Sequence, residues 1–459
     1  MSRQGSAAVN QQTRPLPPKV EGFPLIGALP GLLKDRFDFL EAARRKHGDM
    51  YTLDLGFSRA IILTHPRHVQ HVMVDHQKNY SKNGPMWDSM RTFLGNGLPV
   101  SEGEYWKRQR RLVQPAFHHQ RLMALTDSMV EVIDEHLRRW EGAARTGEPF
   151  DIAQAFAGIT MDVLVRTMFG SGLADEDLKR AAREVTYIID YMLFGMMTHN
   201  LPEWAPVPGR ARYREAIRTV EEILFRVIDQ GRKGGAEDNL LTLMLNMVDA
   251  ESGERMTDAQ IRDEAVGFFV AGFETTSVSL AWAFHLLTQH PEAARRLREE
   301  VDGVLGQRAP VFADLRQLLY SRNVFQEALR LYSPSYWIAR QTVEEDELDG
   351  FRIPAGSTMG VFSYLVHRNP AIWEEPLRFD PDRFTPERSE GRHKQAWLPF
   401  GAGTRTCIGK EFSLMEGQLI LSRVAQRFEV SAIPGREAKL HIGLSMRAKD
   451  GVWLRLKAR

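Results

Sequence analysis

The sequence predicts a mainly α protein with small β-sheets, an α+β fold class. Three observations predict it: most segments between Glu104 and Arg330 show helical periodicity, β-prone runs precede this region, and more of them follow it. The 43% hydrophobic fraction of the 459 residues is ample for a large core. No convincing linker divides the chain, so one domain over residues 19–459 is expected, after a flexible tail over residues 1–18.

Strands are expected on both sides of the helical region. Tyr51–Leu55 and Ala60–Thr64 flank a turn that contains Gly56, which predicts a β-hairpin. The elements expected beyond Arg330 are strands at Phe351–Pro354, Thr358–Leu365 and Val430–Leu456, an irregular loop at Leu377–Glu387, and a helix from Gly409 to about Phe428.

A long central helix is predicted from about Asp258 to Gln289. Thr257 and Gln260 form a capping-box pattern at its start, and Pro291 marks the start of the next helix. At 1.5 Å per residue the helix is roughly 48 Å long. Its middle reads Ala271-Gly272-Phe273-Glu274-Thr275-Thr276, where an acid and a hydroxyl on an apolar helix cost desolvation. The pattern alone leaves close helix packing and a functional acid–hydroxyl pair both open.

Cys407 is the only cysteine in the chain. One cysteine excludes an internal disulfide and a four-cysteine zinc or iron–sulfur site. A buried core thiol, a nucleophile and the thiolate ligand of a haem iron stay open. Gly401, Gly403 and Gly409 around it predict a tight loop that a flat group can approach closely, and Arg405 offers that group a cation.

The spacing Phe400-x-x-Gly403-x-Arg405-x-Cys407-x-Gly409 resembles the haem-binding signature of the cytochrome P450 family. Four more segments in the family's order extend the resemblance over nearly the whole chain. They are Trp106-x-x-x-Arg110, Ala271-Gly272-x-Glu274-Thr275, Glu327-x-x-Arg330 and Phe379–Phe384, which contains Arg383. The resemblance implies the cytochrome P450 fold, with a haem between the long central helix and the cysteine loop.

The resemblance also implies roles for single residues. Cys407 would be the proximal thiolate ligand of haem b, the Thr275 hydroxyl would hydrogen-bond dioxygen where the helix opens to water, and Glu274 would help relay protons. The other implied positions are Phe400, Gly401 and Ala271 against the cofactor, Trp106, Arg110, Arg340 and Arg405 as ligands of a haem propionate, and Glu327, Arg330 and Arg383 as a structural triad that locks the cysteine loop. By composition alone, Trp106 with Arg110 also fits a cation–π pair, and Glu327 with Arg330 a surface ion pair.

The activity expected from the resemblance is that of a haem-thiolate monooxygenase. It would insert one oxygen atom of O2 into a hydrophobic terpenoid, fatty acid, steroid or macrolide, by hydroxylation or epoxidation. A peroxygenase or isomerase of the same cofactor class and a non-catalytic haem sensor are the alternatives, and the pair Glu274-Thr275 disfavours the first of these. The residues expected to line the substrate pocket are Trp87, Met90, Phe93, Phe194, Met197, Phe269, Tyr336, Trp337 and Leu444.

Net charge and hydropathy limit the kinds of partner that this chain is expected to have. Sixty Lys and Arg against 59 Asp and Glu give no global attraction to nucleic acid or membrane. The N-terminus is polar and the longest apolar stretch, Ala265–Phe273, is half a membrane span, so a cytoplasmic protein without a membrane anchor is expected. A monomer is expected as well. By the resemblance, electrons from NAD(P)H would arrive through a ferredoxin or flavodoxin and its reductase. The cations of the expected docking face are Lys107, Arg108, Arg111, Arg392, Lys394 and Lys410.

Overall fold

The computed structural model describes residues 14–56, 58–170, 174–198, 201–202, 204–233, 239–249 and 251–459. The chain folds into two compact units. The first contains Met1–Gly84, Trp337–Pro376 and His393–Arg405, and the second contains Pro85–Tyr336, Leu377–Arg392 and Thr406–Arg459. The chain therefore passes from the first unit to the second between Arg405 and Thr406, just before Cys407.

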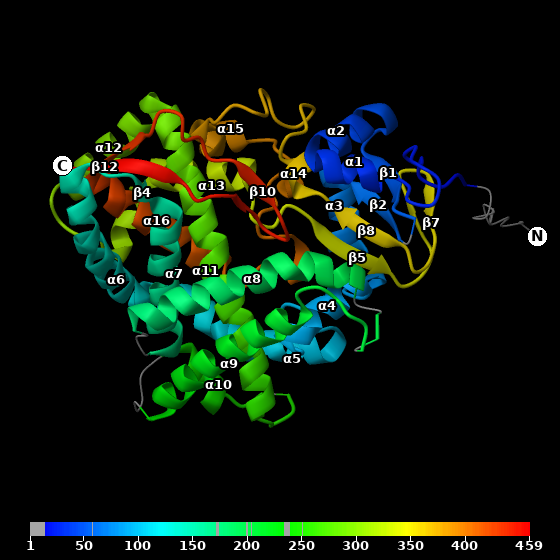
Figure 1. Cartoon of the computed structure of the whole chain (residues 1–459), viewed down its shortest axis with the longest axis horizontal. Coiled ribbons are helices and arrows are strands. Elements are labelled where there is room, and N and C mark those ends of the chain that lie inside the picture. The colour runs from blue at the N-terminus through cyan, green and yellow to red at the C-terminus, as the bar shows by residue number, and fades with distance from the viewer. Residues whose placement is uncertain are drawn as a thin grey trace, which may run out of the picture. The chain divides into compact units, whose positions relative to one another are not determined.

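Short strands and short helices make up the first unit (Figure 1). Its elements are α1 (Leu29–Lys34), α2 (Arg36–His47), β1 (Met50–Asp54), β2 (Arg59–Leu63), α3 (Pro66–Gln70), η2 (His71–Asp75), η3 (Gln77–Asn79), β3 (Tyr80–Ser81), β5 (Ile338–Thr342), β6 (Asp346–Leu348), β7 (Phe351–Ile353), β8 (Thr358–Val361), α14 (Ser363–Val366), η7 (Lys394–Ala396) and η8 (Gly403–Arg405).

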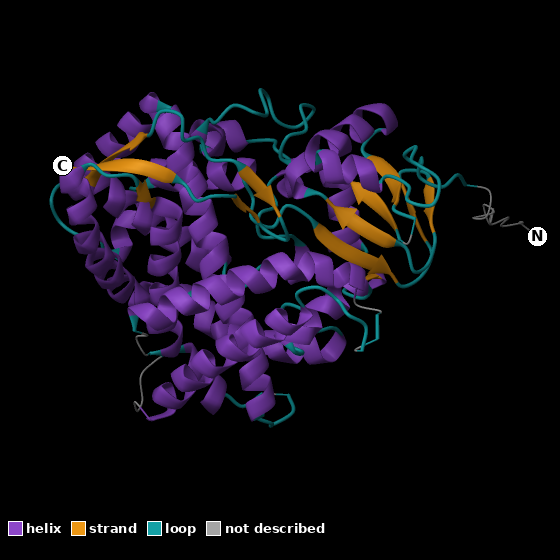
Figure 2. Cartoon of the chain, viewed as in Figure 1, coloured by secondary structure: helices purple, strands orange, loops and turns teal. Residues whose placement is uncertain are grey.

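A five-stranded sheet in the order β1-β2-β8-β5-β3 organises the first unit. β1 and β2 form the predicted antiparallel hairpin, and β2 pairs in parallel with β8, with Leu63 opposite Val361. Residues two apart in a strand share a face, so Ile61 and Leu63 enter the same core as Met359 and Val361. Figure 2 shows these strands in orange, with the purple helices α1 and α2 beside them.

Helices dominate the second unit. Its elements are α4 (Pro85–Leu94), α5 (Gly103–Val113), η4 (Gln114–Phe117), α6 (His119–Thr146), β4 (Phe150–Asp151), α7 (Ile152–Phe169), α8 (Asp175–Thr198), α9 (Arg210–Lys233), α10 (Leu240–Asn246), α11 (Asp258–Gln289), α12 (Pro291–Leu305), η5 (Phe312–Arg316), α13 (Leu319–Leu331), η6 (Pro381–Phe384), α15 (Pro386–Ser389), α16 (Lys410–Arg427), β9 (Phe428–Ala432), β10 (Leu440–Ile442), β11 (Met446–Ala448) and β12 (Trp453–Ala458).

The helix α11 is the core of the second unit and packs against α7, α13 and α16. Its predicted limits are confirmed, because the Thr257 hydroxyl accepts the Gln260 N–H while the Gln260 side chain accepts the Thr257 N–H. By length and composition α7 and α11 are both apolar enough to cross a membrane, and 67% of each apolar window is buried inside the fold. Burial of this extent is what a core helix shows.

Two predicted elements differ in detail from the observed ones. The strand expected to reach Leu365 ends at Val361, and Ser363–Val366 turns into the helix α14. The segment expected as irregular loop contains η6 and α15, because Pro381 and Pro386 each occupy a first helical turn behind a capping side chain. Residues 1–13 of the expected N-terminal tail lie outside the described residues. At the end of that tail, the Pro18 carbonyl accepts a hydrogen bond from the Thr52 N–H in β1.

Candidate functional site

Cys407 lies just before the N-terminus of α16. The backbone N–H of Gly409 donates to its sulfur, and the Arg110 guanidinium is close enough to act on it electrostatically. Burial raises the pKa of the Cys407 thiol, whereas Gly409 and Arg110 lower it. The positive end of the α16 dipole also favours a thiolate. The Gly409 N–H and the Arg110 charge thus favour the thiolate form of Cys407.

Ala271 and Thr275 are accessible although most of α11 around them is buried, and Cys407 is accessible within a segment of half-buried residues. On α11, Phe273 and Glu274 are buried, whereas Ala271 and Thr275, one helical turn apart, are exposed. Cys407 is exposed as well, although burial raises the pKa of its thiol. The face of α11 that carries Ala271 and Thr275 is thus not covered by other parts of the described chain, and it can take a bound group. A flat cofactor can lie against such a face, and a cysteine sulfur is a donor that haem iron accepts, so these residues fit a haem-thiolate group.

Glu274 is 4% exposed and has an asymmetric environment. Its Oε1 accepts a 2.7 Å hydrogen bond from the Ser445 hydroxyl, while its Oε2 has no hydrogen-bond partner among the described residues. Burial raises the pKa of Glu274 to about 7, and the Ser445 hydroxyl and the Arg447 charge oppose that rise. A carboxyl group that titrates near neutral pH and keeps one oxygen unpaired is suited to accepting and releasing a proton.

Hydroxyl groups bind the backbone carbonyls of α11 around this acid. The Thr275 hydroxyl donates to the Ala271 carbonyl at 2.9 Å, the Thr160 hydroxyl to the Phe273 carbonyl at 3.1 Å, and the Ser279 hydroxyl to the Thr275 carbonyl at 2.7 Å. Such bonds compete with the backbone ladder and bend helices. α11 nevertheless runs through this region without a break.

Trp106 and Arg110 lie four residues apart on α5 and so share one face. Trp106 is 8% exposed, and Arg110 Nη1 donates to the Thr406 carbonyl at 3.1 Å. Burial lowers the pKa of Arg110, and the charge of Cys407 opposes this effect. Arg110 is therefore fixed beside the cysteine segment.

The expected docking cations on α5 are paired with carboxylates. Lys107 contacts Glu104 at 2.6 Å and Arg108 contacts Glu254 at 2.6 Å. Arg111 likewise contacts Glu251 at 2.9 Å. The positive potential of α5 is consequently weaker than the sequence indicates.

Four predicted cofactor residues belong to the first unit: Arg340, Phe400, Gly401 and Arg405. Arg340 is 6% exposed in β5 and donates to the Ala339 carbonyl at 2.7 Å. Phe400 packs edge-on against Trp397 with ring centroids 5.8 Å apart. Gly401 has a left-handed φ of 70°, and Arg405 ends the short turn η8 in a half-buried position.

Glu327 and Arg330 are fully buried, and the structure brings them together with Arg383. Arg330 binds Glu327 through two hydrogen bonds, Nε to Oε2 at 2.6 Å and Nη2 to Oε1 at 2.8 Å. Arg383 Nε lies 3.3 Å from Glu327 Oε1, and the Asp380 N–H donates to the same oxygen at 3.0 Å. This cluster joins α13 to η6.

The expected pocket residues come from several elements. α11 contacts both α4 and α8, and these two also pack against each other. Tyr336 uses its hydroxyl in a 2.7 Å hydrogen bond to the Gly443 carbonyl. Trp87, Phe93, Phe269 and Tyr336 are buried, whereas Met90, Phe194, Trp337 and Leu444 are half-buried, and the side chain of Met197 lies outside the described residues.

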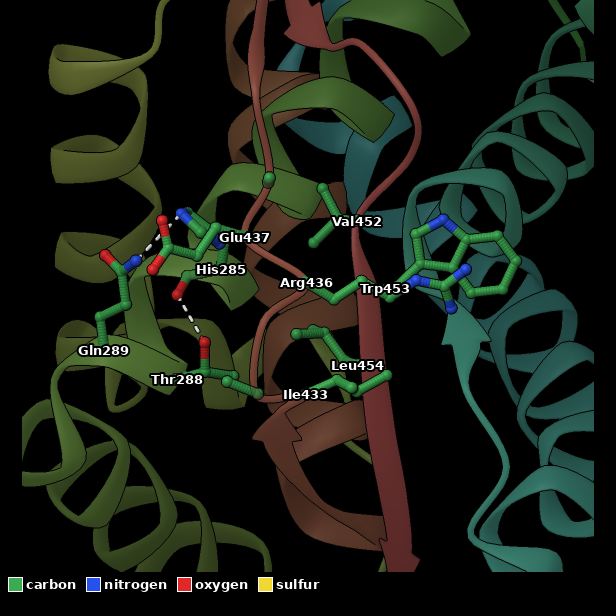
Figure 3. A pocket seen from close by; sticks show the side chains of 11 residues that line it. His285, Thr288, Gln289, Ile433, Arg436, Glu437, Val452, Trp453 and Leu454 are labelled. Carbon is green, nitrogen blue, oxygen red and sulfur yellow. Dashed lines mark hydrogen bonds between the residues drawn. The ribbon is translucent and has the colours of Figure 1, made fainter.

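A separate surface pocket lies near the C-terminal end of α11 (Figure 3). His285 and Gln289 line it, and their Nε2 atoms are 3.2 Å apart. Arg436 and Trp453 are also among its lining residues, and the Arg436 guanidinium lies 4.3 Å from the centroid of the Trp453 ring. His285 is about 16 Å beyond Glu274 along the helix at 1.5 Å per residue, so this pocket is not part of the candidate active site.

Two polar residues of the site were missed by the sequence reasoning. Ser445 gave no signal, because it is 171 residues from its partner Glu274. Glu416 is fully buried in α16, where burial raises its pKa well above the usual range and the Thr276 hydroxyl opposes the rise. The sequence signal that could have identified Glu416 is that it is the single acid in the mostly apolar stretch Leu414–Leu421.

Comparisons with known proteins agree with this geometry. The sequence profile described as Cytochrome P450 matches residues 17–451. The chain is 36% identical to the cyclooctat-9-en-7-ol 5-monooxygenase of Streptomyces melanosporofaciens, over 90% of this chain and 89% of that protein. It is 30% identical to the pentalenene oxygenase of Streptomyces avermitilis, over 91% of each chain. A crystal structure of the cytochrome P450DA haem domain matches with a TM-score of 0.88 at 27% identity, covering 97% of this chain and 98% of that one.

Proposed function

This chain belongs to the cytochrome P450 family and is a P450 monooxygenase, and we propose that it oxidises a cyclic terpenoid with Cys407 as the thiolate ligand of its haem. When bound, the haem supplies the activation of O2 and the transfer of one oxygen atom to the substrate. The observation that carries the assignment of Cys407 is an accessible sulfur that receives the Gly409 N–H and faces the Arg110 charge.

The ligand assignment is tested by spectroscopy. The reduced protein with carbon monoxide is expected to show the strongly red-shifted Soret band of a thiolate-ligated haem. Cys407→His is expected to abolish this band while haem is still bound. A red-shifted band that survives the substitution contradicts the assignment.

Proton delivery is proposed to run through Glu274 and Thr275. Burial raises the pKa of Glu274 to about 7, and its Oε2 has no hydrogen-bond partner among the residues that the structure describes. Thr275 presents an accessible hydroxyl on the same helix. Together they give the middle of α11 a proton donor and a hydroxyl that can pass the proton on.

Arg110 and Trp106 are proposed to bind a haem propionate. The planar fork of an arginine meets a carboxylate with two hydrogen bonds, and Arg110 is already held beside the cysteine segment by Thr406. The same role for Arg340 and Arg405, and the contacts of Phe400, Gly401 and Ala271 with the cofactor, stay predictions that rest on the resemblance.

A cyclic terpenoid substrate is supported by the named activities of the relatives. Cyclooctat-9-en-7-ol 5-monooxygenase and pentalenene oxygenase carry terpenoid names, and both align along most of this chain. The half-buried apolar side chains Met90, Phe194 and Leu444 are the kind that a hydrocarbon skeleton contacts. Cyclic diterpenes and sesquiterpenes are expected to shift the haem spectrum at lower concentration than fatty acids of equal carbon number, and to gain one oxygen on turnover. Tighter binding and oxidation of the fatty acids instead would contradict this.

The electron donor is proposed to be a ferredoxin or flavodoxin with its reductase. Because Lys107, Arg108 and Arg111 are already paired, salt is expected to slow reduction only modestly. Turnover with NAD(P)H and these carriers supports the proposal, and turnover with peroxide alone supports the peroxygenase alternative. A cytoplasmic location and a monomeric state belong to the same proposal.

A further inference from the structure

The short segment η2 departs from α-helical geometry and places two histidines together. In an α-helix, residues five apart point about 140° away from each other. In η2, which is a π-helical turn, the N–H of His76 donates to the carbonyl of His71 at 2.8 Å. The two imidazole rings consequently stack, with centroids 3.9 Å apart and planes 14° from parallel. Turns of this kind frequently mark functional sites.

Asp346, at the start of β6, adds a carboxylate to this pair. Its Oδ2 lies 2.8 Å from His71 Nε2 and 3.8 Å from His76 Nδ1. One donor atom from each of the three residues lies within 4.8 Å of the other two. The Tyr80 hydroxyl donates to the same Oδ2 at 2.6 Å, and the Glu347 N–H donates to Oδ1 at 2.7 Å. These two bonds orient the carboxylate, as outer partners of metal ligands do.

We propose that His71, His76 and Asp346 bind a divalent transition metal ion, with zinc as the best match. Two imidazole nitrogens and one carboxylate oxygen are a zinc donor set that leaves one position for water. Side-chain exposure is 18% for His71, 12% for Asp346 and 50% for His76. The half-exposed His76 therefore gives the ion access from solvent, and binding the ion requires its ring to turn out of the stack with His71.

The site is connected to the turn that precedes Cys407. An added Cβ on Gly403 would lie 1.9 Å from the carbonyl oxygen of Met73 in η2, so the two backbones touch. The Thr404 hydroxyl also donates to Gln77 Oε1 at 2.6 Å. An ion that holds His71 and His76 to Asp346 would stiffen the segment that supports this turn, and it would stabilise the folded protein by mass action.

Zinc binding to the full-length, haem-loaded protein tests the proposal. The protein, free of affinity tag and stripped with a chelator, is dialysed against buffered Zn²⁺, and bound zinc is counted per haem by elemental analysis. His76→Gln and Asp346→Asn remove one ligand each, and Tyr80→Phe removes only the outer hydroxyl. His118→Gln is the matched control, because it also replaces an exposed histidine by glutamine. His118 is the C-cap residue of η4 and is far from these ligands in sequence.

One zinc per chain is expected for the wild type and for His118→Gln. His76→Gln and Asp346→Asn are expected to lower zinc affinity by about a hundredfold, and Tyr80→Phe by about tenfold. Zinc is also expected to raise the melting temperature of the wild type but not of His76→Gln. Equal zinc binding by wild type and His76→Gln, or no zinc above background, would overturn the proposal, and neither result bears on the haem chemistry.

Discussion

The hydroxyl of Ser445 donates a 2.7 Å hydrogen bond to Oε1 of Glu274 and so joins the turn between β10 and β11 to the middle of α11. Ser445 is 9% exposed and Glu274 4%, so the bond forms away from bulk water. Burial favours the neutral acid and the bond favours the carboxylate. The balance puts the pKa of Glu274 at about 7, where its protonation responds to small changes in its surroundings.

Removing the Ser445 hydroxyl is expected to raise the pKa of Glu274 further. Ser445→Ala takes away a donor that stabilises the carboxylate and leaves desolvation in place. Infrared titration of the protonated carboxyl band measures this, with Glu274→Gln identifying the band. An unchanged or lower pKa in Ser445→Ala would contradict the role given to this bond.

Glu274→Gln is expected to change how stability depends on pH. Between its ordinary pKa of 4.5 and the folded value of about 7, the unfolded chain releases the proton while the folded protein keeps it. Stability therefore falls as pH rises through this window, and the loss is complete above about pH 7. The substitution removes the loss, so it is expected to stabilise by up to about 3 kcal/mol at pH 8 and by little at pH 4. Denaturant curves at several pH values measure it, and parallel pH curves for both proteins would count against a buried, titrating Glu274.

Thr275→Ala is expected to uncouple electron use from product formation. Among the described residues, the Thr275 hydroxyl bonds to the local Ala271 carbonyl alone, so the fold and haem content are expected to survive its loss. Product per NAD(P)H is expected to drop several-fold while peroxide rises, and Thr275→Ser is expected to keep most of the coupling. If Thr275→Ala and the wild type couple equally well, the hydroxyl has no part in proton delivery.

Glu327→Ala is expected to destabilise the protein severely. It leaves Arg330 and Arg383 without their shared carboxylate and the Asp380 N–H without an acceptor. Breaking a buried ion pair in this way costs about 3–5 kcal/mol. The control is Glu292→Ala, which breaks an ion pair of the same three-residue spacing on the surface of α12. Melting temperature and soluble haem-loaded yield are the measurements, and equal behaviour of the two variants would show that the buried cluster is dispensable.

Gly403→Ala is expected to prevent stable haem binding. The new Cβ would lie 1.9 Å from the Met73 carbonyl oxygen at a φ of 69°, so the turn before Cys407 must move. Gly391→Ala is the control, because Gly391 has a φ of 72° but no described atom within 4 Å of an added Cβ. Gly391→Ala is expected to lower the free energy of unfolding by about 1–2 kcal/mol, which is the penalty for a left-handed conformation in a residue with a Cβ. Haem content per protein distinguishes the two, and normal haem content in Gly403→Ala would contradict the prediction.

The sequence predicted the long helix and the family because both are local patterns. The capping pair Thr257 and Gln260 lies three residues apart, and the spacing around Cys407 fits within ten residues. These signals need no knowledge of which distant segments meet. The hairpin at β1 and β2 was predicted for the same reason.

Contacts between residues far apart in the sequence could not be predicted from such local patterns. The bond between Ser445 and Glu274 depends on how the β10–β11 turn packs on α11, and no sequence period records that. The carboxylates that pair with Arg108 and Arg111 come from the segment after α10, so the docking face looked more positive in sequence than it is. The π-helical turn at His71 was equally hidden, because its sequence continues an ordinary helix pattern.

The parallel pairing of β2 with β8 has a consequence for biosynthesis. During synthesis, β2 cannot pair with β8 until Val361, the partner of Leu63, has been translated. Val361 follows Leu63 by roughly 300 residues, which takes about 15–60 s at typical translation rates. Until then, the edge of β2 that later pairs with β8 lacks its partner strand at Ile61, Ile62 and Leu63. Such an unpaired edge is a template for association with other chains. Slower initiation or cooler growth, which keeps fewer nascent chains side by side, should therefore raise the soluble yield of this protein more than a stronger promoter does.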